Sequence, residues 1–323
     1  MNELAGFAID LDLLRAFERG LDPQHPERSA IPAQVLGYGE ISTVLEIRLP
    51  PLAGLAFKRL PLFHTWEEVA RYRDAYVEYN RLLEQAIGLS LPAHGYAAFA
   101  NDAGQPRFYI IQEQLPAPSI GSRAIHLLTR EGVLALVRRV LEELGKVWAF
   151  NRAQERLRVA IDAQISNWSI AGFDPQNPQV KGDTRLLYLD TSTPLFRVGG
   201  AEQLDPELFL RSAPSFLAWA LRLLYLKEVV DRYYDLRKVV TDLVANFFKE
   251  QRAELVGDLV TLANGSLAGE GAAPISEQEV SAYYRQDATI WSLYLAARQI
   301  DRALRTRLLR REYPYVLPGK IRR

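Results

Sequence analysis

Most of the predicted strands lie in the first 115 residues, where short apolar runs are separated by turn-forming residues, and most of the helical periodicity follows. Between residues 34 and 61, short β-prone apolar runs are broken by Gly-Tyr-Gly and Pro-Pro-Leu-Ala-Gly, which is typical of strands joined by turns. Residues 66–87 place apolar and aromatic side chains three or four positions apart, which predicts a helix. Runs at 95–100 and 107–114 flank the turn-forming sequence Asn-Asp-Ala-Gly-Gln and predict a hairpin.

The remainder is mainly helical in its pattern. Thr129 is placed to cap a helix whose apolar positions repeat up to Trp148. The other expected elements are helices at 9–17, 205–264 and 276–311 and strands at 168–172 and 185–190, with a linker at 265–274. The pattern predicts a small sheet with one main helix, followed by a helical part that holds a short hairpin, in the α+β class.

Composition narrows the partners and the chemistry. Among 323 residues, 39 basic side chains balance 39 acidic ones, so no net charge attracts nucleic acid or acidic lipid. The absence of cysteine excludes disulfides, thiolate nucleophiles and Cys-based metal sites. No basic n-region opens the sequence and no apolar run reaches about 18 residues. We therefore expect a cytoplasmic protein without a membrane or nucleic-acid partner, and the sequence leaves a homodimer open.

Two stretches carry candidate chemistry. The sequence Ile-Asp-Ala-Gln-Ile-Ser-Asn places the amide of Asn167 five positions after the carboxylate of Asp162, and Asp190 ends the apolar run Leu-Leu-Tyr-Leu. A base and two oxygen ligands for a divalent cation are what phosphoryl transfer requires. Taken singly, each residue has another interpretation. Asp162 could be a turn residue, Asn167 a cap at a strand start, and Asp190 part of an Asx-turn before Pro194.

Upstream residues suggest the partners of this set. Gly37 and Gly39 lie between two predicted strands, where their backbone could approach phosphate oxygens or simply form a β-turn. Lys58 ends the next strand and could hold phosphates or be an ordinary edge lysine. Glu78, on the following helix, could pair with that lysine or be a solvated surface residue; Glu67 and Glu68 compete with it near the helix start.

In this order, the motifs resemble the protein-kinase-like superfamily over residues 34–190. They are most similar to its small-molecule branch, such as aminoglycoside phosphotransferases and choline-kinase-like enzymes. The resemblance implies a bilobal fold, with an antiparallel β-sheet N-lobe at 1–115 and a mainly α-helical C-lobe at 116–323. Within the N-lobe, residues 1–33 are an extension and residues 34–115 hold the nucleotide.

The resemblance also implies site roles that involve ATP and Mg²⁺. Lys58 corresponds to the lysine on the α- and β-phosphates and Glu78 to its helix partner, while Asp162 corresponds to the catalytic base. Asn167 and Asp190 correspond to the magnesium ligands, so the catalytic loop is 162–167 and the metal-binding segment is 190–193. The nucleotide contacts would come from Gly37, Gly39, Ser42, Lys58 and Glu78 and from the backbone of a hinge at Glu113 to Leu115.

Several positions depart from the family pattern. Ala-Ile-Asp stands where His-Arg-Asp or His-Gly-Asp is common, Thr-Ser follows Asp190 in place of Phe-Gly, and Ser42 replaces a third glycine. These departures argue against a protein kinase. They leave a phosphotransferase that acts on a hydroxyl of a small-molecule acceptor or, as the alternative, a non-catalytic nucleotide-binding or interaction module. A helical interaction protein whose motif matches arise by chance is the third reading.

Two features of the C-terminal part stay open. The segment from Arg302 onward, with Lys320, Arg322 and Arg323, is locally basic and is either a solvated helix face or an anion-binding surface. Aromatic residues expected in the core, of which some could line the acceptor pocket, are Tyr225, Tyr233, Tyr234, Tyr283, Tyr284, Trp291 and Tyr294.

Overall fold

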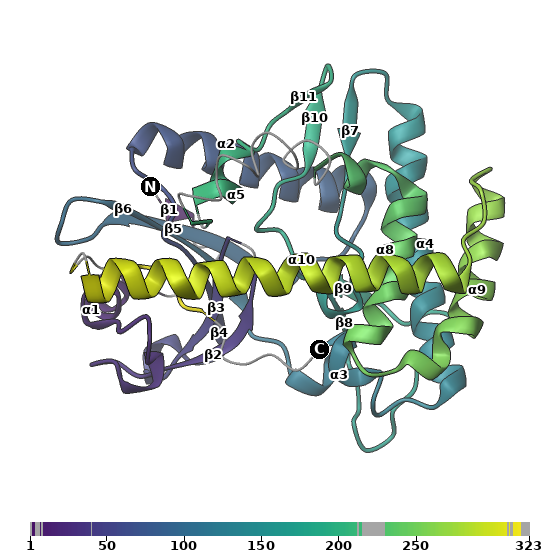
Figure 1. Cartoon of the computed structure of the whole chain (residues 1–323), viewed down its shortest axis with the longest axis horizontal. Helices are drawn as coiled ribbons and strands as arrows, with labels where there is room; N and C mark the ends of the chain where they lie inside the picture. Colours follow the sequence, from purple (N-terminus) through teal and green to yellow (C-terminus); the bar gives the residue numbers. More distant parts are fainter. Residues whose placement is uncertain are drawn as a thin grey trace.

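A sheet-containing N-lobe lies beside a helical C-lobe (Figure 1). The computed structural model describes residues 2–3, 7, 9–39, 41–211, 213–214, 230–308, 310 and 313–317. No described helix is both long enough and apolar enough to cross a lipid bilayer. The architecture is α+β, as the sequence predicts.

The N-lobe sheet has six antiparallel strands in the order β1-β5-β6-β4-β3-β2. The strands are β1 (Asn2–Glu3), β2 (Ala33–Tyr38), β3 (Thr43–Ile47), β4 (Leu55–Leu60), β5 (His94–Ala100) and β6 (Pro106–Glu113). The hairpin predicted around Asn101 is confirmed, since β5 and β6 pair along their whole length. In the β2–β3 pair the register shifts between Val35 and Gly37, which marks a bulge at the glycine loop.

Helices cover both faces of this sheet. Helix α2 (Trp66–Arg81) begins at a capping box between Thr65 and Glu68 and continues as one π-helical segment (Leu82–Ile87), so the helix predicted at 66–87 is confirmed. Its Tyr72 and Tyr76 pack with Phe63 and Phe108 on one face of the sheet. Helix α1 (Leu11–Gly20) packs Leu14 and Phe17 against the opposite face.

The C-lobe is built on the long helix α4 (Arg130–Ala153), which Thr129 caps as predicted. The other α-helices in the described part of this lobe are α3 (Gly121–Ala124), α5 (Glu207–Arg211), α8 (Leu236–Lys249), α9 (Val256–Gly269) and α10 (Glu277–Ala303). In the view of Figure 1, α10 crosses both lobes along the length of the molecule. The region 205–264, expected to be helical, is divided by short 3₁₀ turns at Arg232–Tyr234 and Ala253–Leu255. Residues 212 and 215–229 lie outside the described part.

The expected linker at 265–274 is partly wrong. Helix α9 runs on to Gly269, and this extension buries Leu267 in the core, which offsets the low helix propensity of Gly265 and Gly269. The true connection is shorter, and Asn264 holds its far end through hydrogen bonds with the backbone of Ile275. The segment therefore joins α9 to α10 tightly and does not separate two domains.

Five short strands complete the C-lobe. Strands β8 (Trp168–Ile170) and β9 (Leu186–Tyr188) form the predicted hairpin, with Trp168 opposite Tyr188. Strands β7 (Leu157–Val159), β10 (Phe196–Val198) and β11 (Ala201–Glu202) form a second small sheet in the order β11-β10-β7. Two of these strands, β7 and β9, lead directly into the polar segments that carry the candidate site.

Candidate active site

A cleft of about 570 Å³ lies between the two lobes and collects most of the predicted site residues. Residues of β2, β3, β4 and the end of β6 line it from the N-lobe, and the loops after β7 and β9 line it from the C-lobe. The predicted residues that line this cleft are Gly37, Gly39, Ser42, Lys58, Glu113, Leu115, Asp162, Asn167 and Asp190. The tenth, Glu78, does not line it.

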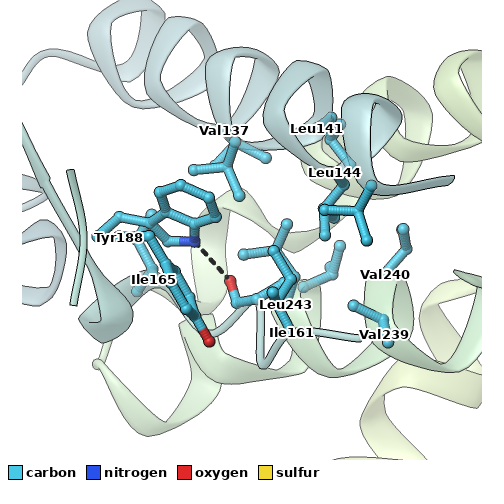
Figure 2. Close-up of a cluster of buried hydrophobic side chains, with 14 of the residues drawn as sticks. Val137, Leu141, Leu144, Ile161, Ile165, Tyr188, Val239, Val240 and Leu243 are labelled. Atoms are coloured by element: carbon cyan, nitrogen blue, oxygen red, sulfur yellow. Dashed lines mark hydrogen bonds between the residues drawn. The ribbon is translucent and has the colours of Figure 1, made fainter. Parts of the chain in front are cut away.

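Buried apolar residues alternate with partly exposed polar residues along the loop after β7, and this pattern orients the loop. Ile161, Ala163, Ile165 and Trp168 are buried, while the intervening polar residues are only partly covered and face the cleft. In Figure 2, Ile161 and Ile165 belong to one apolar cluster with side chains of α4 and α8. Since the apolar side chains fix the backbone on one side, the carboxylate of Asp162 must point to the other.

Asp162 is held at both its backbone and its side chain. The Asn167 Nδ2 donates to the carbonyl oxygen of Asp162 at 3.2 Å, and the Gln164 N–H donates to Asp162 Oδ1 at 3.0 Å. Burial, with the nearby carboxylates of Asp242 and Asp190, raises the pKa of Asp162 to about 7, although the Gln164 N–H opposes this shift. Near neutral pH, this carboxyl group can therefore accept a proton.

Lys58 and Asp190 meet across the lobes. Lys58 is buried on β4, its Nζ donates to the Leu189 carbonyl oxygen at 2.5 Å, and it lies 3.8 Å from Asp190 Oδ1. Burial lowers the pKa of Lys58, and the charge of Asp190 acts against this effect. Asp190 Oδ1 also accepts a hydrogen bond from Ser192 Oγ at 2.7 Å. The lysine predicted from the strand pattern thus reaches the segment predicted to bind metal.

The expected pairing of Lys58 with Glu78 is wrong. Glu78 forms an ion pair with Arg81 at 2.7 Å, and its side chain is 42% exposed, because the buried stripe of α2 is formed by tyrosines on another side of the helix. Glu68 does not replace it. Its carboxylate completes the N-terminal cap of α2 and binds Arg211. The only carboxylate paired with Lys58 among the described residues is that of Asp190.

The glycine loop is shaped by close contact and not by unusual backbone angles. Neither Gly37 nor Gly39 has a positive φ. The Gly39 N–H donates to the Ser42 carbonyl oxygen at 2.9 Å, and a Cβ on Gly39 would lie 2.9 Å from Ser42 Oγ. A side chain at Gly39 would therefore require Ser42 Oγ to move, whereas the nearest atom to a Cβ at Gly37 would be 4.0 Å away.

The predicted hinge has one unused donor. The N–H groups of Glu113 and Gln114 already donate to the carbonyl oxygens of Ala93 and Gly54. Among the described residues, none accepts a hydrogen bond from the N–H of Leu115. Leu115 is therefore the hinge residue that can offer an N–H to a ligand in the cleft, and the N–H of Glu113 cannot.

The donor set fits Mg²⁺. No described residue donates to Asn167 Oδ1 or to Asp190 Oδ2, so one amide and one carboxylate oxygen remain free beside the cleft. Within the described part, no group of three or more His, Cys, Asp or Glu side chains forms a complete metal cage. Two hard oxygen ligands suit a magnesium ion that takes its other ligands from water and phosphates.

Sequence reasoning missed a second polar cluster. Gln164 donates from Nε2 to Asp242 Oδ2 at 3.2 Å, and its Oε1 accepts from Asn246 and Lys249. Asp242, Asn246 and Lys249 recur three or four positions apart on helix α8, a signal that was present in the sequence. They line the cleft together with Arg232 and Asp287.

Of the aromatic candidates for an acceptor pocket, four line the cleft: Tyr233, Tyr283, Tyr284 and Trp291. Tyr234 instead donates to Glu202, and Tyr294 packs beside Trp291. Tyr225 lies outside the described residues, as do Lys320, Arg322 and Arg323 of the basic tail.

These elements define a protein-kinase-like fold. An antiparallel sheet with a glycine loop and a strand lysine lies over a helical lobe whose two polar segments face the same cleft. The chain belongs to the Family of unknown function (DUF6206), whose family model matches residues 23–302.

Comparisons with other proteins give distant similarities. No curated protein matches the chain. The chain is similar to a solved structure of WaaP in complex with acyl carrier protein (16% identity, TM-score 0.31), covering 73% of this chain and 90% of that one. It is similar to a mutant aminoglycoside 2'-phosphotransferase-IIIa in its GDP complex (10%, TM-score 0.35; 74% and 93% covered). It is also similar to the maize SIRK1 kinase domain bound to AMP-PNP (15%, TM-score 0.33; 81% and 100% covered).

Proposed function

We propose that the protein is an ATP- and Mg²⁺-dependent phosphotransferase that transfers the γ-phosphoryl group to a hydroxyl of a small molecule. The observation that carries this proposal is the convergence of Lys58, Asp162, Asn167 and Asp190 on one interlobe cleft. A buried cation, a carboxyl group able to accept a proton and two free oxygen donors supply the charge stabilisation and positioning on which phosphoryl transfer depends.

Each side chain has a separate task in this proposal. Leu115 offers its backbone N–H to the adenine, and Lys58 holds phosphate oxygens once its bond to the Leu189 carbonyl is exchanged for them. Asn167 and Asp190 would hold Mg²⁺, which neutralises phosphate charge when it is bound. Asp162 orients the acceptor hydroxyl and takes its proton, while residues 1–115 form the nucleotide-holding lobe and residues 116–323 the acceptor lobe.

The test combines binding with turnover. Isothermal titration of ATP should show binding that requires Mg²⁺ and is lost in Asp190→Ala. Incubation with ATP, Mg²⁺ and a panel of amino alcohols, sugars, nucleosides and aminoglycosides should give transfer that falls by about 100-fold or more in Asp162→Ala. If no transfer and no ATP hydrolysis occur, and Asp162→Ala behaves like the parent protein, the catalytic proposal fails.

A second candidate function is a non-catalytic nucleotide-binding or interaction module. The observation in its favour is that Lys58 has no glutamate partner on α2 and is instead bonded to the Leu189 carbonyl oxygen. This function predicts that nucleotide raises the thermal stability of the protein without turnover. Measuring both quantities on the same preparation separates the two candidates.

A further inference from the structure

Three buried tyrosine hydroxyl groups end on the backbone of the segments that carry the candidate site. Tyr79, on α2, donates to the Ala160 carbonyl oxygen at 2.7 Å. Tyr188, at the end of β9, accepts a hydrogen bond from the Asp162 N–H at 3.2 Å. Tyr72, also on α2, donates to the Ser192 carbonyl oxygen at 2.7 Å. The three side chains are at most 2% exposed.

Two of these tyrosines bind the backbone next to Asp162 from opposite lobes, Tyr79 from α2 and Tyr188 from β9. Burial and the charge of Asp190 raise the pKa of Tyr79 far above its ordinary value, so its hydroxyl is protonated at neutral pH and can donate to the Ala160 carbonyl oxygen. Tyr79 thus fixes the carbonyl of Ala160 and Tyr188 the N–H of Asp162, so the two hydroxyls hold the backbone on both sides of residue 161.

The two tyrosines bind the loop at a position where the sequence departs from the pattern of the resembling family. Position 160 is an alanine, so the loop lacks the histidine that the resembling family commonly places there. Helix α2 also supplies no glutamate to Lys58. Helix α2 instead contacts the site through tyrosine hydroxyls. Tyr79 donates to the loop that contains Asp162, and Tyr72 donates to the segment after Asp190.

We infer that Tyr79 and Tyr188 are positioning residues for Asp162, because their hydroxyls hold the backbone of the loop that presents its carboxylate to the cleft. The inference rests on the proposed function for its catalytic consequence.

The test removes one hydroxyl at a time. Tyr79→Phe and Tyr188→Phe keep the rings and delete one link each. Tyr109→Phe is the matched control, because Tyr109 is equally buried and its hydroxyl is bonded to Glu18 of α1 and not to the loop of Asp162. The first readout is hydrogen–deuterium exchange of the peptide that covers residues 158–167, which does not depend on activity.

We expect exchange in residues 158–167 to accelerate by about 10-fold in both test variants and to stay unchanged in Tyr109→Phe. The affinity for ATP with Mg²⁺ should change by less than about 3-fold, whereas kcat should fall by about 10- to 100-fold, since misplacing a reacting group affects turnover more than binding.

Unchanged exchange in folded Tyr79→Phe and Tyr188→Phe proteins would overturn the inference, as would a kcat equal to that of Tyr109→Phe. The proposed function fails by a different result, namely a parent protein without phosphotransfer. In that case accelerated exchange in the two variants would still show that the tyrosines hold the loop.

Discussion

At the scale of residues, two aspartates of the cleft differ in their surroundings, and this difference assigns them different tasks. Asp162 is surrounded by buried apolar side chains and other carboxylates, which raise its pKa to about 7. Asp190 instead lies beside the Lys58 ammonium group and accepts a hydrogen bond from Ser192. A carboxyl group that titrates near neutrality suits proton transfer, and a carboxylate with a nearby cation suits a metal or phosphate site.

The first prediction concerns Asp162→Asn. The folded-state pKa of Asp162 lies above its unfolded value of about 3.9, so its contribution to stability is complete below pH 4 and is lost as the pH rises through about 7. Asparagine does not ionise, so the Asp162→Asn variant does not lose this stability as the pH rises. After allowance for partial solvent access, the variant should be more stable than the parent by about 1–2 kcal/mol at pH 8 and nearly equal to it at pH 4. Urea denaturation at both pH values measures the difference; a variant less stable at pH 8 would contradict the prediction.

The second prediction compares Glu78 with Lys58. Since Glu78 pairs only with the exposed Arg81, Glu78→Gln should leave ATP affinity unchanged and alter the free energy of unfolding by less than about 0.5 kcal/mol. Lys58→Met, which removes the buried cation at the cleft, should weaken ATP binding by at least about 10-fold. Titration calorimetry distinguishes the two variants. Equal losses would mean that Glu78 reaches Lys58 in the bound state.

At the scale of elements, the loop of Asp162 is held by the short helix α3, which the sequence pattern did not predict. A Cβ on Gly121, the first residue of α3, would lie 2.2 Å from the Ile165 carbonyl oxygen, so the helix and the loop touch through backbone atoms. Ser119 supports the same contact, because its Oγ lies 2.8 Å from Ser169 Oγ. The segment that joins the lobes is thus also a wall of the site.

The third prediction follows from this contact. Gly121→Ala should push the loop away from α3 and destabilise the protein by about 1–3 kcal/mol, because a backbone neighbour cannot move as a flexible side chain can. Gly145→Ala on α4 is the matched control, since nothing lies within 4 Å of its new Cβ. Chemical denaturation of both variants provides the measurement. Equal stabilities would show that the loop adjusts without cost.

The fourth prediction concerns α1. Its Glu18 is buried between Arg59 and Arg107 and is hydrogen-bonded to Tyr109. Burial alone would raise the pKa of Glu18, but the charge of Arg59 holds it below its ordinary value. Glu18→Gln leaves two guanidinium groups without their counter-charge and should cost about 3–5 kcal/mol at pH 7. Because the lowered pKa stabilises only above the unfolded pKa of about 4.3, this cost should shrink as the pH falls below 4. A cost that does not depend on pH would contradict this account.

The elements were predictable from sequence to the extent that local pattern determines them. Helix α2, the β5–β6 hairpin and the β8–β9 hairpin follow from periodicity and turn chemistry. The partner of Glu78 was not predictable, because it depends on which side of α2 is buried. The buried side holds three tyrosines, and Glu78 lies outside it. The polar face of α8 could have been found, but its link to Gln164 is a tertiary contact between positions about 80 residues apart.

At the scale of the whole molecule, buried side chains and an ion pair connect the two lobes in addition to the linker between them. Leu204 and Leu208, which follow the site in sequence, are buried in the N-lobe core beside Phe63 and Tyr72. Arg211 of α5 forms a bidentate pair with Glu68 at the start of α2. A segment of the C-lobe chain is therefore part of the N-lobe core and forms a second connection between the lobes.

The last prediction follows from this arrangement. The N-lobe cannot unfold alone without exposing Leu204 and Leu208, so calorimetry should show one transition whose van't Hoff and calorimetric enthalpies agree. Hydrogen bonds from Arg211 lower the pKa of Glu68 to about 2, so the pair stabilises fully above the unfolded pKa of about 4.3 and is lost as the pH falls through 2. Arg211→Gln should accordingly cost about 1 kcal/mol at pH 7 and almost nothing near pH 2. Two resolved transitions in the parent protein would mean that the lobes are independent, and the cleft would then be a mobile gap in place of a preorganised site.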